Sequence, residues 1–90
     1  MAWRIEFEPQ ARKELDRLGS EASARIVRTI RTRVANLEDA RSIGEPLAGT
    51  WSGYWRYRFG DYRVIARIDD ERLMILVVRV AHRREAYRQR

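Results

Sequence analysis

The 90-residue sequence contains no cysteine and a single histidine, His82. The absence of cysteine excludes disulfides, thiolate nucleophiles and cysteine-ligated zinc or iron–sulfur centres. One histidine cannot build a histidine-based zinc site or an HExxH centre. We therefore expect no metal and no other cofactor.

Long apolar runs are also missing. The longest, Leu73–Val78, is far shorter than the roughly 18–20 residues of a membrane helix. The N-terminus lacks the charged-then-apolar order of a signal peptide. We expect a cytoplasmic protein without membrane contact. Its length and its hydrophobic content of 44% predict a single domain over residues 1–90.

Negative charge is scarce in the second half of the chain. Residues 1–50 carry nine basic and eight acidic side chains, whereas residues 51–90 carry ten and five, which leaves this half at +5. Such a field favours a polyanionic partner. Eighteen of the nineteen basic residues are arginine. An arginine-rich genome would produce the same bias, so the position of each arginine is more informative than their number.

The first half of the sequence predicts a strand followed by two helices. Apolar and polar residues alternate over residues 3–7, as in a half-buried strand. Pro9 suits the first turn of a helix that ends near Gly19, and Ser20 is the expected cap of a longer second helix. The apolar stripe of this second helix comprises Ala22, Ile26, Ile30, Val34 and Leu37.

A loop and three strands are expected to follow. Glycine and proline mark the loop over residues 39–53, and apolar runs predict strands over residues 54–59, 62–68 and 73–80. The predicted fold class is α+β, a small single domain in the order strand–helix–helix–three strands. A helical hairpin is expected on one face of an antiparallel twisted sheet.

The first hairpin has a register that its turn fixes. Gly60-Asp61 suits a type II′ turn, and Arg58 then lies directly opposite Arg63. One face of the hairpin is apolar and suits packing under the helices: Trp55, Tyr57, Phe59, Tyr62, Val64, Ala66 and Ile68. The opposite face, called the arginine face below, holds Tyr54, Arg56, Arg58, Arg63, Ile65 and Arg67.

The opposed pair Arg58 and Arg63 indicates a binding function. Like charges in this arrangement destabilise a sheet by about 0.2–1 kcal/mol. Guanidinium groups gathered on one surface suit a phosphodiester, because each engages phosphate oxygens with two hydrogen bonds. The alternative is an ordinary solvated sheet face that arginines shield from association.

The C-terminal segment is expected to return to this face. A turn at residues 69–71 places Arg63 opposite Val78, and the chain then leaves the last strand beside the Gly60-Asp61 turn. The residues that come together there can stack on a base and contact a phosphate. These residues are His82, Arg83 and Tyr87.

Six segments carry a resemblance to a known family. The most specific is Val80–Tyr87, which is close to the pattern V-G-H-R-x-x-x-Y. The others are Phe7-Glu8-Pro9, Ala11-x-x-Glu14-Leu15, Pro46-Leu47-Ala48-Gly49, Tyr54-Trp55-Arg56-Tyr57-Arg58 and Tyr62-Arg63-Val64. The order of these segments along the chain matches a known family, and the match extends over essentially the whole chain. The sequence resembles the RelE-type toxins of type II toxin–antitoxin modules, in the RelE/ParE superfamily.

The resemblance implies a ribosome-dependent endoribonuclease that cuts mRNA in the ribosomal A site without metal. The ribose 2′-OH attacks the adjacent phosphate, and translation stops. By motif position, the implied catalytic residues are Arg56, Arg58, Arg63, Arg83 (as general acid) and Tyr87 (stacked on the codon). Further RNA contacts are expected from Tyr54, Arg67, Arg84 and Arg88. The implied partners are the ribosome, mRNA and a small acidic RelB-like antitoxin.

The chain departs from the family pattern at two positions. The best-known member has lysines in place of Arg56 and Arg58. Arginine essentially cannot lose its proton, so Arg56 is expected to act through its charge. Because an imidazole titrates near neutral pH, His82 becomes the better candidate for acid–base catalysis. Similar toxins with a histidine at this position pair it with a glutamate, and the resemblance suggests Glu45 as that partner.

Two other functions are compatible with this pattern. The first is a ParE-like toxin, which shares the fold but inhibits DNA gyrase without cleaving RNA. The second is a module that binds nucleic acid without chemistry. The motif matches that favour the nuclease are Arg58, Arg63, Arg83 and Tyr87.

Overall fold

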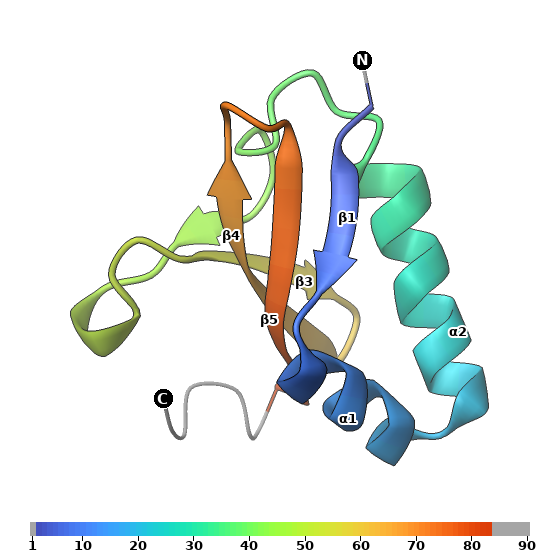
Figure 1. Ribbon diagram of the computed structural model, residues 1–90. Helices are drawn as coiled ribbons and strands as arrows, with labels where there is room; N and C mark the ends of the chain where they lie inside the picture. Colours follow the sequence, from blue (N-terminus) through green and yellow to red (C-terminus); the bar gives the residue numbers. More distant parts are fainter. Residues whose placement is uncertain (1, 84–90) are drawn as a thin grey trace.

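The computed structural model describes residues 2–83 of the chain (Figure 1). This part folds into two α-helices and five strands, with a π-helical turn (η1) after α2 and a 3₁₀ turn (η2) before β3. The bounds are Arg4–Phe7 (β1), Pro9–Leu18 (α1), Ser20–Thr29 (α2), Ile30–Val34 (η1), Glu45–Pro46 (β2), Gly49–Trp51 (η2), Trp55–Phe59 (β3), Tyr62–Asp69 (β4) and Met74–His82 (β5).

The strands form one sheet in the order β1-β5-β4-β3-β2. The pairs β2–β3, β3–β4 and β4–β5 are antiparallel, whereas β1 pairs with β5 in parallel, with Arg4 opposite Met74. The α+β class with a helical hairpin on one face is confirmed, but the expectation of an all-antiparallel sheet is wrong at β1. Tight turns force β3, β4 and β5 to alternate in direction, whereas β1 is joined through two helices and is free of that constraint.

The ends of the helices follow from proline and glycine. Pro9 is the first residue of α1, where its missing N–H costs no hydrogen bond. Gly19, with φ 95°, ends α1 and is also the N-cap of α2. Ser20 is therefore the first helical residue rather than the predicted cap. Neither helix of the described chain is long and apolar enough to cross a membrane.

The buried stripe of α2 continues into the π-helical turn. Ile26, Ile30 and Val34 are all buried, at four-residue spacing. Because an α-helix has 3.6 residues per turn, each four-residue step rotates such a stripe by about 40°. In η1 the N–H of Ala35 bonds to the carbonyl of Ile30, five residues back. This wider turn offsets part of the rotation and keeps Val34 in the core.

The main core lies between the helices and one face of the sheet (Figure 1). The predicted apolar face of the hairpin is confirmed: Tyr57, Val64 and Ala66 are buried in this core, and Trp55, Phe59, Tyr62 and Ile68 pack against it. Burying a side chain of the size of Val or Leu contributes about 1.5–3 kcal/mol. This face of the sheet is therefore the main source of stability.

The β4–β5 hairpin differs from the prediction. Asp69 pairs with Met74, so the turn has four residues, 70–73, and ends at Leu73 in the left-handed region (φ 49°). A bulge between Ile65 and Ala66 shifts the register once more. As a result Arg63 lies opposite Ala81 instead of Val78.

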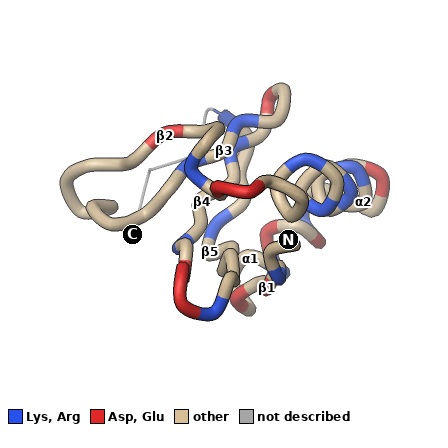
Figure 2. The backbone as a smooth tube through the Cα atoms, turned by 90° about the horizontal axis from the view of Figure 1, so that it is seen from above, with Lys and Arg blue, Asp and Glu red and all other residues tan. Residues whose placement is uncertain are grey.

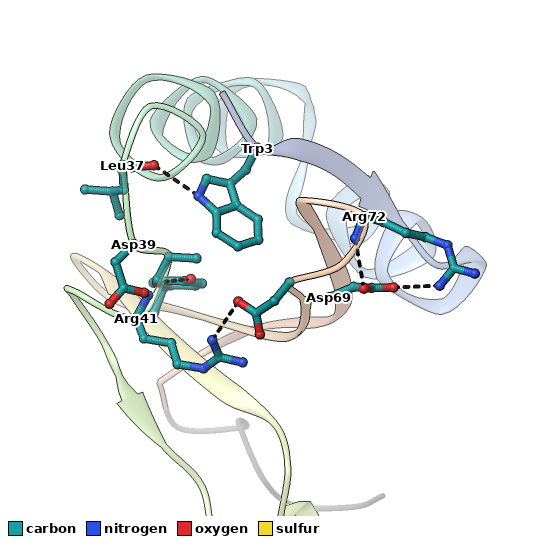
Figure 3. Close-up of polar contacts among 9 residues, drawn as sticks. Trp3, Leu37, Asp39, Arg41, Asp69 and Arg72 are labelled. Carbon is teal, nitrogen blue, oxygen red and sulfur yellow. Dashed lines mark hydrogen bonds and ion pairs between the residues drawn. The ribbon is translucent and has the colours of Figure 1, made fainter. Parts of the chain in front are cut away.

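The segment between η1 and β2 is tied to one end of the sheet (Figure 3). The Trp3 indole donates to the carbonyl of Leu37 at 3.0 Å, and Arg41 pairs with Asp70 at 3.0 Å. The hydroxyl of Tyr57 donates a hydrogen bond to the carbonyl of Ala40 at 2.6 Å. Burial raises the pKa of this hydroxyl. These contacts fix the path of the chain toward β2 at the edge of β3.

Candidate functional site

The arginine face begins with the opposed pair Arg58 and Arg63, and the structure confirms this register. Gly60 has φ 61°, whereas Asp61 has no positive φ, which fits the type II′ turn. In Figure 2, basic positions recur along β3 and β4. The hairpin turn thus aligns two like charges one residue pair away from it.

Strand β2 places a carboxylate inside this cluster. Glu45 lies opposite Arg56, and one of its carboxylate oxygens accepts a hydrogen bond from the Arg56 guanidinium. The other oxygen lies 3.6 Å from Nη2 of Arg58. The Arg56 side chain is 13% exposed and that of Arg58 is 56% exposed. One carboxylate therefore balances two guanidinium groups, of which Arg58 stays accessible to a ligand.

The electrostatics of the cluster favour an added anion. Burial lowers the pKa of Arg56, and the positive charges of Arg58 and Arg63 lower it further. The guanidinium of Arg63 donates to the carbonyls of Gly60 at 3.0 Å and Tyr62 at 3.2 Å. A phosphate at this place would relieve repulsion among the arginines.

Arg83, the residue that follows β5, lies against the hairpin turn. Its backbone N–H donates to the carbonyl of Asp61 at 2.7 Å, and its Nε lies 4.0 Å from a carboxylate oxygen of Asp61. Ala81, two residues earlier, lies opposite Arg63. The structure thus brings Arg83 to the turn that Arg63 also contacts.

His82 does not join the arginine face, contrary to the prediction. It pairs with Tyr62, and the two rings meet edge to face with centroids 6.0 Å apart. Because paired residues share a face, His82 lies on the helix-covered side of the sheet. Its suggested partnership with Glu45 is also wrong, since β4 and β3 separate β5 from β2, roughly 14 Å at the usual strand spacing.

Arg67 lies away from the cluster. It is four residues beyond Arg63 along β4, a distance of about 13 Å, and it borders a cavity of about 520 Å³ beside the β4–β5 turn. Asp69 and Arg72 pair in that turn at 2.8 Å, and this hydrogen bond holds the pKa of Asp69 below its usual value. Arg67 therefore belongs to the same sheet as the arginine cluster but lies outside the cluster.

A small apolar cluster on the arginine face was missed by the sequence analysis. Trp51, in the segment predicted as a loop, packs with Ile65 and Val78, and its ring meets Tyr54 edge to face at 5.2 Å. The signal was Ile65, an apolar residue on a face otherwise lined with arginine. Tyr54 thus lies on the predicted face, half-buried beside Trp51.

The cluster opens into a shallow cavity of about 210 Å³. Arg33 from the helical side, together with Gly44, Glu45 and Arg58, lines part of it. Within residues 2–83, no group of three or more His, Asp or Glu side chains is placed to hold a metal ion. Three predicted site residues lie outside the described residues: Arg84, Tyr87 and Arg88.

Two curated proteins of Mycobacterium tuberculosis are similar to the chain. Toxin RelG is 30% identical over 89 residues, which cover 99% of this chain and 100% of the relative. Toxin RelE is 31% identical over 78 residues, which cover 87% and 78%.

Solved structures show the same fold. A chain of the toxin–antitoxin complex RelBE2 from Mycobacterium tuberculosis superposes with a TM-score of 0.83 at 28% identity, and the match covers 91% of this chain and 92% of that one. The isolated RelE toxin of E. coli superposes with a TM-score of 0.66 at 19% identity, covering 90% and 84%.

These similarities define the class of protein, a toxin of a type II toxin–antitoxin system in the RelE/ParE superfamily. The family follows from a model described as "ParE toxin of type II toxin-antitoxin system, parDE", which matches residues 5–87. The chain belongs to this family.

Proposed function

We propose that this toxin is an endoribonuclease that acts in the cytoplasm, cuts mRNA in the ribosomal A site and so arrests translation. The observation that carries the proposal is the opposed pair Arg58 and Arg63 beside the carboxylate of Glu45, on a sheet face that the helices leave open. Cations for a phosphorane and a proton acceptor for a hydroxyl are what this reaction needs. Two relatives named RelG and RelE give it further support.

In the proposed reaction, Glu45 takes the proton of the ribose 2′-OH. The 2′-oxygen then forms a bond to the adjacent phosphorus, and the bond from phosphorus to the 5′-oxygen breaks. The products are a 2′,3′-cyclic phosphate and a 5′-OH, whose proton comes from water. Arg58 and Arg63 stabilise the charge on the phosphorane oxygens, while the buried Arg56 holds Glu45 in place.

The remaining predicted residues act around this centre in the proposal. Arg83, held at the hairpin turn, contacts a neighbouring phosphate through its charge, because a guanidinium keeps its proton at neutral pH. Base stacking on an aromatic ring is worth about 1–3 kcal/mol. We assign base or backbone contacts to Tyr54, Arg67, Arg84, Tyr87 and Arg88, with Tyr87 as the stacking residue.

His82 is the second candidate for proton transfer. The argument for it is chemical, because an imidazole both donates and accepts a proton near neutral pH. The argument against it is its place beside Tyr62, across the sheet from Arg63. Glu45 and His82 lie too far apart to act on one phosphate, so only one of them can be the principal group.

The proposal includes dependence on the ribosome and control by an antitoxin. A single carboxylate among arginines is a weak catalyst on flexible RNA, and holding the codon in a reactive geometry is worth up to roughly 7–11 kcal/mol. The similar structures include toxin–antitoxin complexes, such as RelBE2. A small acidic antitoxin would complement the net charge of +6 of this chain.

Gyrase inhibition is the alternative, because the matching family model is named for ParE. The decisive experiment uses purified toxin in two assays. Primer extension on ribosomes with an open A site should show cleavage within the A-site codon, with little cleavage of the same mRNA alone. Supercoiling by DNA gyrase should be unaffected. Inhibited gyrase together with intact mRNA would replace the proposal by the ParE-like function.

A further inference from the structure

The second helix and the π-helical turn η1 that continues it carry a set of arginines that the proposed cleavage site does not use. They are Arg25, Arg28, Arg31 and Arg33, called the α2 arginines below, and all four are exposed. Across residues 2–83, none of them forms an ion pair. Figure 2 shows basic positions recurring along α2. Four uncompensated charges on one helix make this the second basic surface of the molecule.

The first helix provides the contrast. The segment from Ser20 to Val34 holds four arginines and one acidic residue, Glu21, an excess of three positive charges. Helix α1 holds three basic and two acidic residues, an excess of one. One of its basic residues, Arg12, lies over the ring of Phe7 at 6.0 Å. Positive charge is therefore concentrated on α2 rather than spread over the helical hairpin.

The α2 arginines begin at the edge of the proposed site. Arg25 and Arg33 border a cavity of about 420 Å³ that Gly60 and Tyr62 of the β3–β4 hairpin also line. Arg33 additionally borders the smaller cavity beside Glu45 and Arg58. From Arg25 to Arg33 the helix rises about 12 Å, which spans several phosphates of one strand. The α2 arginines thus lie beside the hairpin turn, on the helix-covered side of the sheet, where a second RNA can contact them while the arginine face holds the strand that is cut.

We propose that the α2 arginines bind the sugar-phosphate backbone of a folded RNA, separate from the strand that is cut. The identification of that RNA as ribosomal rests on the proposed function, whereas the binding itself does not. A protein interface needs buried apolar or aromatic anchors. The other exposed positions of this helical segment hold none: Ser20, Glu21, Ala24 and Thr32. Charge without apolar surface is complementary to a phosphate backbone.

The direct test measures binding of a short, blunt-ended RNA duplex at several salt concentrations. The variant Arg25→Gln/Arg28→Gln/Arg31→Gln leaves the residues of the cleavage site unchanged. Its matched control, Arg12→Gln/Lys13→Gln/Arg17→Gln, removes three positive charges from α1. Since each phosphate contact contributes about 0.9 to the slope of log K against log salt, the α2 variant should lower the slope by about 2–3 and the control by less than 1. Equal slopes for both variants would overturn the proposal.

A second arm separates this proposal from the cleavage function. On programmed ribosomes the α2 variant should raise KM roughly tenfold and leave kcat within about twofold, as expected for binding that is uniform along the reaction. A fall in kcat at unchanged KM would count against the proposal. If the wild-type protein does not cleave at all, the proposed function fails, and the duplex assay still decides the α2 surface. A variant that binds the duplex normally but loses affinity for polyglutamate would point to an acidic protein partner and overturn the proposal.

Discussion

The two faces of the sheet are built from the same strands but differ in charge and burial around the β3–β4 hairpin turn. On the helix-covered face, Tyr57 and Val64 pair across the hairpin and are buried. One residue along each strand, Arg58 and Arg63 oppose each other on the other face. The first pair stabilises the fold, while the second costs about 0.2–1 kcal/mol. Alternate residues of one strand therefore carry stability and function separately, and each can be changed with little effect on the other.

The largest expected effect is on cleavage, through Glu45→Gln. Removing a general base lowers the rate by about 10²–10⁴-fold. Gln keeps an acceptor for Arg56 but removes the negative charge that balances Arg56 and Arg58, so the variant should stay folded with a lower melting temperature. The measurement is single-turnover cleavage on programmed ribosomes, with thermal unfolding alongside. His82→Gln is the comparison variant and should lose less than tenfold. If the two variants exchange these effects, His82 is the proton-transfer group and our assignment of Glu45 is wrong.

On the helix-covered face the expected effect is on stability. Ile75 is 1% exposed and lies in the main core, so Ile75→Ala should lower the free energy of unfolding by about 2–5 kcal/mol. The control is Arg67→Ala on the arginine face, an exposed position where a change within about 0.5 kcal/mol is expected. Chemical denaturation measures both. Equal losses of unfolding free energy in the two variants would show that both faces contribute to stability alike.

Gly44 directly precedes Glu45, and Gly44→Ala tests how firmly Glu45 is held. A Cβ at Gly44 (φ 84°) would lie 2.4 Å from the carbonyl oxygen of Arg56. At Gly53 (φ 93°) the same backbone strain arises, but the added Cβ meets nothing within 4 Å. Strain of this kind costs about 1–3 kcal/mol, and Gly44→Ala should exceed Gly53→Ala because of the clash. A melting temperature equally lowered in both variants would mean that β2 adjusts freely.

The smallest expected effect is the stability of Arg58→Gln. The substitution removes the repulsion from Arg63 and an exposed ion pair with Glu45, two contributions of similar size and opposite sign. The free energy of unfolding should therefore stay within about 0.5 kcal/mol of the wild type. Urea unfolding measures it. A loss of several kcal/mol would show that Arg58 has a structural role.

The sequence was informative where a local rule fixes the geometry. Two-residue alternation and the Gly60-Asp61 turn were enough to predict both faces of the first hairpin and the pair Arg58 and Arg63, and both are confirmed. The β4–β5 hairpin was predicted wrongly because its register depends on a left-handed Leu73 and on a bulge at Ile65. Neither has a sequence signal, since leucine rarely adopts a positive φ. His82 was misplaced as a consequence.

The position of the Glu45 carboxylate could not be predicted from local sequence rules, for a different reason. The strand that carries Glu45 has two residues, too few for any periodicity. Its position depends on tertiary contacts, such as the hydrogen bond from the Trp55 indole to the carbonyl of Ile43 at 2.8 Å. The candidate site therefore combines residues from segments that are distant in the sequence.

The most direct test of the central claim compares an arginine of strand β4 with an arginine of the β4–β5 turn. Arg63 lies in the arginine cluster, whereas Arg72 pairs with Asp69 in the β4–β5 turn. Single-turnover cleavage of the A-site codon should fall roughly 10²–10³-fold for Arg63→Gln, as for the loss of one donor to a transition-state oxyanion. For Arg72→Gln it should stay near the wild-type rate, with both proteins folded. Wild-type cleavage by folded Arg63→Gln, or an equal loss in both variants, would contradict the assignment of the arginine face as the site of RNA cleavage.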